Sequence, residues 1–168
     1  MVALAIVVAR LQYLRSIRTI ESRDAHMSSN TLHVRLYAEK DEEDVVDLWQ
    51  ICFPNDPPWN APWTVIDCKL RVQRELFLVG ELHGRIICTA LGGYDGFGGW
   101  VYHVATLPRY RRAGFGRRMM QEMERRLREK GCSKLNLQLR RWSDAALAFY
   151  RALGYRVEDR ISMGKRLG

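Results

Sequence analysis

Apolar and polar positions change their spacing from one segment of the chain to the next, and each spacing predicts an element. In residues 32–38 (LHVRLYA) apolar side chains alternate with polar ones, as in a half-buried strand. In residues 43–53 they recur at helical spacing, and Asp41 is a suitable N-cap. Four prolines within residues 54–63 exclude regular structure there. A second helix is expected over residues 63–74.

Three consecutive apolar runs in the middle of the chain predict strands. They occupy residues 75–82, 85–93 and 100–106, and glycine-rich turns separate them. His83 and Gly84 suit a tight hairpin, since glycine tolerates a positive φ. A meander of antiparallel strands is therefore expected.

The C-terminal part of the chain alternates helix and strand patterns. A long helix follows the strand at 100–106 and ends at Gly131, a glycine suited to a helix C-terminus. Residues 134–140 alternate as a strand, residues 143–154 form a short helix, and residues 155–167 supply one or two final strands. The strand–helix–strand passage implies parallel pairing within a mostly antiparallel sheet. The predicted class is α/β (α+β), with a mixed, mostly antiparallel sheet flanked by helices.

Residues 1–30 differ from the rest and are assigned to an N-terminal extension outside the fold. Their apolar run ends at Arg10, which is too short to span a bilayer. The positive charges follow this run, whereas a secretory signal begins with them. Two interpretations stay open: an amphipathic targeting or surface helix, and a start-site artefact before Met27, which we prefer. A single domain over residues 32–168 is expected.

Composition narrows the class of partner and the compartment. A chain of 168 residues is long enough to bury a core. Its formal net charge of +8 is compatible with nucleic acid, a membrane surface or a small polyanion. The four cysteines lie outside CxxC spacing and without a His–Cys cluster, so no metal site is expected. A reducing compartment fits such cysteines, and we predict a cytoplasmic location.

Residues 111–116 (RRAGFG) place two glycines and two arginines at the start of the long helix. Glycine costs about 1 kcal/mol against alanine inside a helix, so its presence calls for a reason. Free N–H groups and the positive end of the helix dipole would bind a phosphate that only glycines let approach closely. The alternative is a tight strand-to-helix turn with solvated arginines. Rossmann and P-loop motifs are disfavoured, because their glycine spacing and the Gly-Lys-Ser/Thr sequence are missing.

Two segments together carry a resemblance to a known family. The segment VATLPRYRRAGFGRRMM resembles the acetyl-CoA signature of the GNAT N-acetyltransferase superfamily, in which Val-x-Val-x-Pro precedes Gln/Arg-x-x-Gly-x-Gly/Ala and a helix. The segment SDAALAFYRALGY is similar to the family's Asn-x-x-Ala-x-x-x-Tyr-x-x-x-Gly-Phe/Tyr. The order of expected elements over residues 32–168 also matches. The resemblance implies the GNAT acyl-CoA N-acyltransferase fold.

The resemblance also implies acetyl-CoA as co-substrate. In the family, a bulge separates the strand before the loop from its neighbour, and main-chain groups there bind the pantetheine arm. Ser143 stands where many relatives carry an asparagine that contacts the cofactor. The implied cofactor-binding residues are Val104, Ala105, Thr106, Arg111, Arg112, Ala113, Gly114, Phe115, Gly116, Arg117 and Ser143.

Direct transfer of the acetyl group to a primary amine is the reaction that the resemblance implies. Tyr150 matches the family tyrosine, whose phenol can protonate the departing thiolate. Relatives often carry a Glu or His that serves as the general base at positions matching Trp100 or Tyr102, where this chain has aromatic residues. His103 is predicted to be structural, because strand alternation turns it away from Tyr102. Asp95 acting through water, or no dedicated base, stays open.

The acceptor is expected between the proline-rich loop and the glycine-rich turn that precedes the strand at 100–106. Trp59, Trp63, Tyr94 and Trp100 could wall a pocket there or cover the edge of the core. The acceptor amine could belong to a small molecule or a protein. A homodimer is compatible with the family, and neither nucleic acid nor a membrane is expected as a partner.

Two other functions stay open. The arginines in residues 109–128 suggest a basic nucleic-acid-binding module, and the missing base suggests an acyl-CoA-binding protein without catalysis. Glutamates are interleaved with the arginines of the long helix. This pattern favours intrahelical ion pairs on a solvated face over nucleic-acid binding.

Overall fold

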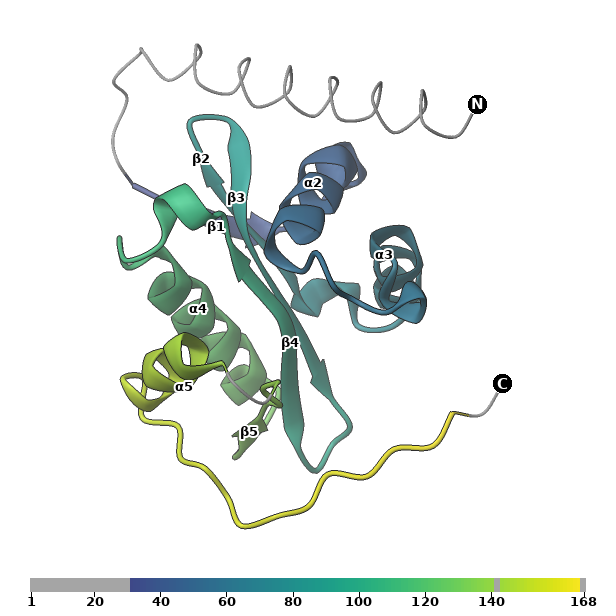
Figure 1. Cartoon of the computed structure of the whole chain (residues 1–168), viewed down its shortest axis with the longest axis vertical. Coiled ribbons are helices and arrows are strands. Elements are labelled where there is room, and N and C mark those ends of the chain that lie inside the picture. Colours follow the sequence, from purple (N-terminus) through teal and green to yellow (C-terminus); the bar gives the residue numbers. More distant parts are fainter. Residues whose placement is uncertain (1–30, 141–142, 167–168) are drawn as a thin grey trace.

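The computed structural model describes residues 31–140 and 143–166, arranged as a twisted sheet with helices on both faces (Figure 1). The extension predicted for residues 1–30 lies outside the described residues. The strands are β1 (His33–Leu36), β2 (Phe77–Leu82), β3 (Arg85–Tyr94), β4 (Gly99–Thr106) and β5 (Leu135–Asn136).

The five strands lie side by side in chain order, β1-β2-β3-β4-β5. The first four form the predicted antiparallel meander, and β4 pairs with β5 in parallel. A tight turn joins β2 to β3, and both of its residues are left-handed, with φ of 51° at His83 and 76° at Gly84. The mixed, mostly antiparallel sheet is therefore confirmed.

Helices cover the two faces of the sheet (Figure 1). On one face lie α2 and α3, and on the other lie α4 and α5. Because both faces are covered, seven consecutive residues of β3 are fully buried. The α-helices are α2 (Glu42–Cys52), α3 (Pro62–Arg71), α4 (Phe115–Glu129) and α5 (Asp144–Arg151). Short 3₁₀ turns are formed by Glu39–Asp41, Pro58–Asn60, Arg74–Leu76 and Pro108–Tyr110.

The packing of α4 onto the sheet depends on small residues in the strands. Met119, Met120 and Met123 form the buried stripe of α4, and all three are fully buried. A Cβ at Gly80 of β2 would lie 3.0 Å from the sulfur of Met119, and one at Gly92 would collide with Met123. Glycine at these two positions therefore lets the helix approach the sheet closely.

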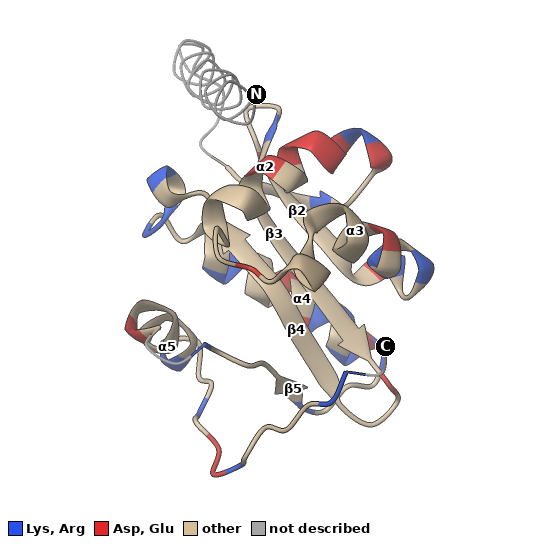
Figure 2. Ribbon diagram, turned by 45° about the vertical axis from the view of Figure 1, so that its right-hand side comes forward, with Lys and Arg blue, Asp and Glu red and all other residues tan. Residues whose placement is uncertain are grey.

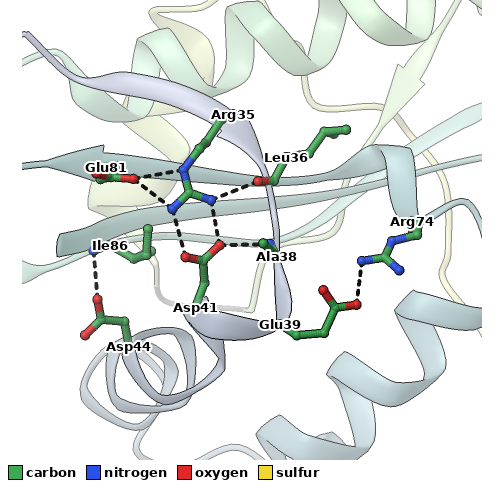
Figure 3. A network of polar contacts seen from close by, with 9 residues as sticks. All are labelled: Arg35, Leu36, Ala38, Glu39, Asp41, Asp44, Arg74, Glu81 and Ile86. Atoms are coloured by element: carbon green, nitrogen blue, oxygen red, sulfur yellow. Dashed lines mark hydrogen bonds and ion pairs between the residues drawn. The ribbon is translucent and has the colours of Figure 1, made fainter. Parts of the chain in front are cut away.

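A cluster of charged residues joins β1, β2 and the start of α2 (Figure 3). Arg35 donates from Nη1 and Nη2 to the two carboxylate oxygens of Asp41, at 2.6 and 2.8 Å, and from Nε to Glu81 at 2.8 Å. Asp41 is at the N-cap position of α2 as predicted, but its side chain accepts from Arg35 and from the Ala38 N–H instead of capping the helix. Burial alone would raise the pKa of the Asp41 carboxyl, but these bonds outweigh it and lower the pKa.

The C-terminal strands are where the prediction is wrong. The strand expected over residues 134–140 is reduced to Leu135–Asn136, and no strand forms within residues 155–166. Val157, Ile161 and Met163 remain 69%, 90% and 91% exposed. Apolar residues in an extended segment form a strand only where a neighbouring strand pairs with their backbone groups, and this segment contacts the residues around β5 through side chains, Glu158 with Lys134 and Ser162 with Gln138.

Candidate active site

The parallel pair β4–β5 is hydrogen-bonded only at the start of β4. Gly99 pairs with Leu135 and Trp100 with Asn136, whereas β4 continues to Thr106 beside β3 alone. One edge of the second half of β4 therefore has no strand partner among the described residues. This is the separation of strands that the resemblance implies.

A bulge lies in the same half of β4. The register with β3 shifts between Thr89 and Leu91, so that His103 and Val104 together stand opposite Ala90. His103 is left-handed, with φ of 49°. Its carbonyl accepts a hydrogen bond of 3.0 Å from the Thr89 hydroxyl, which itself accepts one of 2.8 Å from the Trp49 indole N–H. This buried network holds the bulge in place.

The loop into α4 contains two further left-handed residues, Arg112 with φ of 67° and Gly114 with φ of 82°. Gly114 is the N-cap residue of α4, and no atom lies within 4 Å of the position that a Cβ would occupy. The first N–H groups of an α-helix have no partner within the helix, and they carry its positive dipole end. Open space therefore adjoins the start of α4.

Gly116 has a different reason to be glycine. A Cβ there would lie 3.2 Å from the Phe149 ring of α5 and 3.6 Å from the Thr106 hydroxyl of β4. The missing side chain thus lets the start of α4, the end of β4 and the face of α5 meet at one point. The space around the two glycines therefore differs, and phosphate binding by either of them stays a prediction.

The three arginines of the loop differ in what they contact. Arg111 donates from Nε to the Thr106 carbonyl at 3.1 Å, and Arg117 donates from Nη2 to the Ala152 carbonyl at 3.2 Å. Arg112 extends from a left-handed residue and is exposed. Arg111 and Arg117 therefore brace the ends of β4 and α5, which sequence reasoning did not anticipate.

Tyr150 lies on the inner face of α5 and is 8% exposed. Its ring packs against those of Phe149 and Tyr155, with centroids 5.0 and 5.6 Å apart. Burial raises the pKa of Tyr150 to about 12, so its phenol is protonated at neutral pH. Ser143 occupies the N-cap position of α5, without a side-chain hydrogen bond to the helix.

A cavity of about 300 Å³ lies between the loop before α3, α3 itself and β4. Trp59, Lys69, Tyr102 and His103 are among the residues that line it. The prediction that His103 faces away from Tyr102 is wrong, because the bulge interrupts strand alternation and both side chains reach the same cavity.

Of the four aromatic residues proposed to wall a pocket, only Trp59 lines this cavity. Trp63 and Trp100 are 56% and 44% exposed, and the Tyr94 hydroxyl donates to the Gly96 carbonyl at 3.0 Å. Asp95 accepts the N–H groups of Phe97 and Gly98 at 2.8 and 2.7 Å. Asp95 therefore shapes the β3–β4 turn.

Sequence reasoning missed Lys69, which α3 buries against β3. Its Nζ donates to the Gly92 carbonyl at 2.5 Å, and the residue is 4% exposed. Burial lowers the pKa of Lys69 to about 8. The signal was present in its spacing, because Lys69 follows the buried Ile66 by three residues on the same face of a helix.

The arginines of α4 form the predicted intrahelical ion pairs. Arg125 contacts Glu122 at 2.7 Å and Glu129 at 2.5 Å, and Arg126 contacts Glu122 at 2.7 Å. Figure 2 shows these charges of both signs side by side on α4. Among the described residues, no helix is both long and apolar enough to cross a bilayer.

Comparison with known proteins identifies the family of this chain. The model of the Acetyltransferase (GNAT) family matches residues 42–155. A protein of Yersinia pestis (strain Pestoides F) called "Acetyltransferase" is 39% identical over 136 residues, which is 81% of this chain and 96% of that protein.

Two solved structures share the fold. The PaiA N-acetyltransferase of Thermoplasma acidophilum, in complex with coenzyme A, has a TM-score of 0.68 at 18% identity, covering 78% of this chain and 93% of its own. AAC(6')-Iy, in complex with the bisubstrate analog CoA-S-monomethyl-acetylneamine, has a TM-score of 0.68 at 16% identity, covering 82% and 99%. The family model and the Yersinia relative together show that this chain belongs to the GNAT family of acetyltransferases.

Proposed function

We propose that the chain transfers an acetyl group from acetyl-CoA to a primary amine, with Tyr150 as the general acid. The observation that carries this proposal is the convergence of three features. The unpaired edge of β4, the open N-terminus of α4 and the protonated phenol of α5 lie around Gly116 and Phe149. Each suits a different part of a long thioester substrate.

The donor's two ends would be held by backbone groups. Main-chain N–H and C=O groups of Val104 and Ala105 lie at the bulge, where an extended pantetheine arm can pair as a strand does. Amide N–H groups after Gly114 suit the pyrophosphate, and Arg112 adds an exposed charge. The coenzyme A complex of PaiA, a protein of the same fold, supports this arrangement.

The reaction needs one proton to leave and another to arrive. The amine nitrogen attacks the thioester carbonyl carbon, the C–N bond forms, and the C–S bond breaks with its electron pair on sulfur. The Tyr150 hydroxyl then gives its proton to the coenzyme A thiolate, and solvent reprotonates the phenolate. A phenol with a pKa of about 12 carries the proton that this step requires.

The acceptor would occupy the cavity beside β4, on the far side of the bulge from α5. Its aromatic wall, formed by Trp59 and Tyr102, suits the apolar part of an amine. The bisubstrate analog bound to AAC(6')-Iy is CoA-S-monomethyl-acetylneamine, whose name joins coenzyme A to an amine, and this supports an amine acceptor here. Small molecules and protein amines both remain in this class.

A panel of amines tests the proposal. Amino acids, polyamines, aminoglycosides and peptides with free N-termini are incubated with the full chain and acetyl-CoA, and free thiol is followed. We expect thiol release with at least one class, and a fall in kcat of about 100-fold for Tyr150→Phe with acetyl-CoA affinity unchanged.

The matched control is Tyr37→Phe. The Tyr37 hydroxyl is buried and has no hydrogen-bond partner among the described residues, so we expect its removal to leave the rate unchanged. Acetyl-CoA binding without thiol release would indicate a cofactor-binding protein that lacks catalysis. DNA binding at low salt without any turnover would favour the basic nucleic-acid-binding module.

A further inference from the structure

We propose that His103, oriented by Asp56, is the catalytic base that takes the proton from the attacking amine. This inference rests on the proposed function and adds the residue that sequence analysis left unassigned. It depends on where the bulge places the His103 side chain.

His103 stands at the junction of the two halves of the site. Its side chain lines the cavity proposed for the acceptor, while the next residue, Val104, contributes the backbone proposed for the thioester arm. A base must lie within reach of the amine as that amine meets the carbonyl. The bulge brings the imidazole to this position, because an ordinary strand would turn it to the other face.

The imidazole is held in an apolar environment. Its ring lies 4.6 Å from that of Trp49 and 5.6 Å from that of Phe53, between centroids, and its side chain is 13% exposed. Burial lowers the pKa of His103, and the charge of Asp56 opposes that effect. The ring is therefore neutral at pH 7, as a proton acceptor must be.

Asp56 comes from the proline-rich loop and is the carboxylate that faces the ring. Its Oδ2 lies 3.9 Å from His103 Nε2. The same carboxylate contacts Arg140 and accepts from Asn60 Nδ2 at 3.5 Å, so it is held from two sides. An anion beside Nε2 favours the tautomer that carries its proton there, which leaves the lone pair on Nδ1 for the amine.

Other titratable groups near His103 are few among the described residues. Tyr102 is its chain neighbour, and Lys69 and Cys68 of α3 line the same cavity. Burial raises the pKa of Tyr102 and lowers that of Lys69 to about 8. His103 is thus the group in this cavity that changes charge below neutral pH.

The proton balance of the reaction then closes. As the C–N bond forms, the nitrogen loses a proton to His103 Nδ1, and the imidazolium is stabilised by Asp56. Tyr150 supplies a proton to sulfur on the other side of β4. Each group returns to its starting state by exchange with solvent.

The test is the pH profile of kcat/KM for the best amine of the panel, measured in His103→Asn, Asp56→Asn and the control His83→Asn. Asparagine tolerates the left-handed backbone of both histidines, and His83 is exposed at the β2–β3 turn. We expect His103→Asn to lower kcat about 100-fold, to keep the acetyl-CoA KM and to remove the acidic limb below pH 6.5.

Asp56 is a positioning residue, so its variant should keep the limb but move it. Because its negative charge raises the His103 pKa, Asp56→Asn moves the limb to lower pH. If the His103→Asn enzyme keeps both the wild-type kcat and the acidic limb, His103 is not the base, while the proposed acetyltransferase function still stands. No thiol release from the wild-type chain with any amine would refute the proposed function and the base with it.

Discussion

Two arginine-containing regions of the molecule are built in opposite ways. In the cluster around Arg35, all three guanidinium nitrogens donate, to Asp41, to Glu81 and to the Leu36 carbonyl (Figure 3). In the loop before α4, Arg112 has a left-handed backbone conformation and an exposed side chain, and the N-cap Gly114 adjoins open space. The ion pairs of the Arg35 cluster thus hold β1, β2 and the start of α2 together.

The contrast separates a structural use of charge from a binding use. A cluster whose charges are all paired contributes to the free energy of unfolding, so removing one of its members destabilises the folded domain. Unpartnered amides and an exposed charge at a helix N-terminus contribute little to folding, but they suit an anionic ligand. Variants in the two regions should therefore affect different measurements.

The largest effect is expected at Gly114. Gly114→Val places a β-branched side chain over the open amides, and each charge-assisted hydrogen bond lost costs about 1.5–3 kcal/mol. Acetyl-CoA affinity, measured by calorimetry, should fall about 100-fold or more. Gly96→Val is the matched control, since Gly96 is also left-handed with no atom within 4 Å of a Cβ, and it lies in the β3–β4 turn, before the other end of β4. Equal affinities for the two variants would refute the phosphate-binding role of the loop.

The regular secondary structure could be predicted well from the sequence. Within the part of the chain that the structure describes, period-two and helical spacing located β1 to β4 and the helices α2 to α5, because each of them buries one face or stripe. The sequence also placed Gly114 at the start of a helix. The final strands were wrong, because residues 155–166 have strand-like apolar positions but lack a strand to pair with.

The irregular part of the site could not be predicted in the same way. A bulge inserts one residue without a clear sequence signature, and from that point alternation assigns His103 to the wrong face. The contact between Asp56 and Arg140 joins segments 84 residues apart. Such a pair depends on how the proline-rich loop packs against β4 and the segment after β5, which local patterns do not determine.

A smaller effect, of a different kind, is expected at Asp41. Asp41→Asn removes the charge that Arg35 contacts, and the free energy of unfolding should fall by about 2 kcal/mol, within the range for hydrogen bonds to charged groups. The folded pKa of Asp41 lies below its ordinary value of 3.8, so its contribution is present at neutral pH and is lost as pH falls below that value.

Urea unfolding between pH 7 and pH 3 measures both consequences for Asp41. The wild-type chain should lose stability more steeply than the variant over the acidic part of this range, while acetyl-CoA affinity at pH 7 stays unchanged. A variant as stable as the wild type at pH 7 would show that the cluster does not hold β1 to α2.

The smallest effect is expected at Arg112. Arg112→Asn keeps a residue that tolerates the left-handed backbone and removes one exposed charge. Exposed ion pairs contribute little, so acetyl-CoA affinity should fall about two- to fivefold at low salt, and the difference should shrink as salt screens it. Arg71→Asn removes another exposed arginine, which lies on α3 and pairs with Asp67 within its own helix, and should leave the affinity unchanged. Because Arg112 adds only long-range attraction to a site built of backbone amides, a loss as large as that for Gly114→Val would mean that its guanidinium, rather than the start of α4, holds the phosphate.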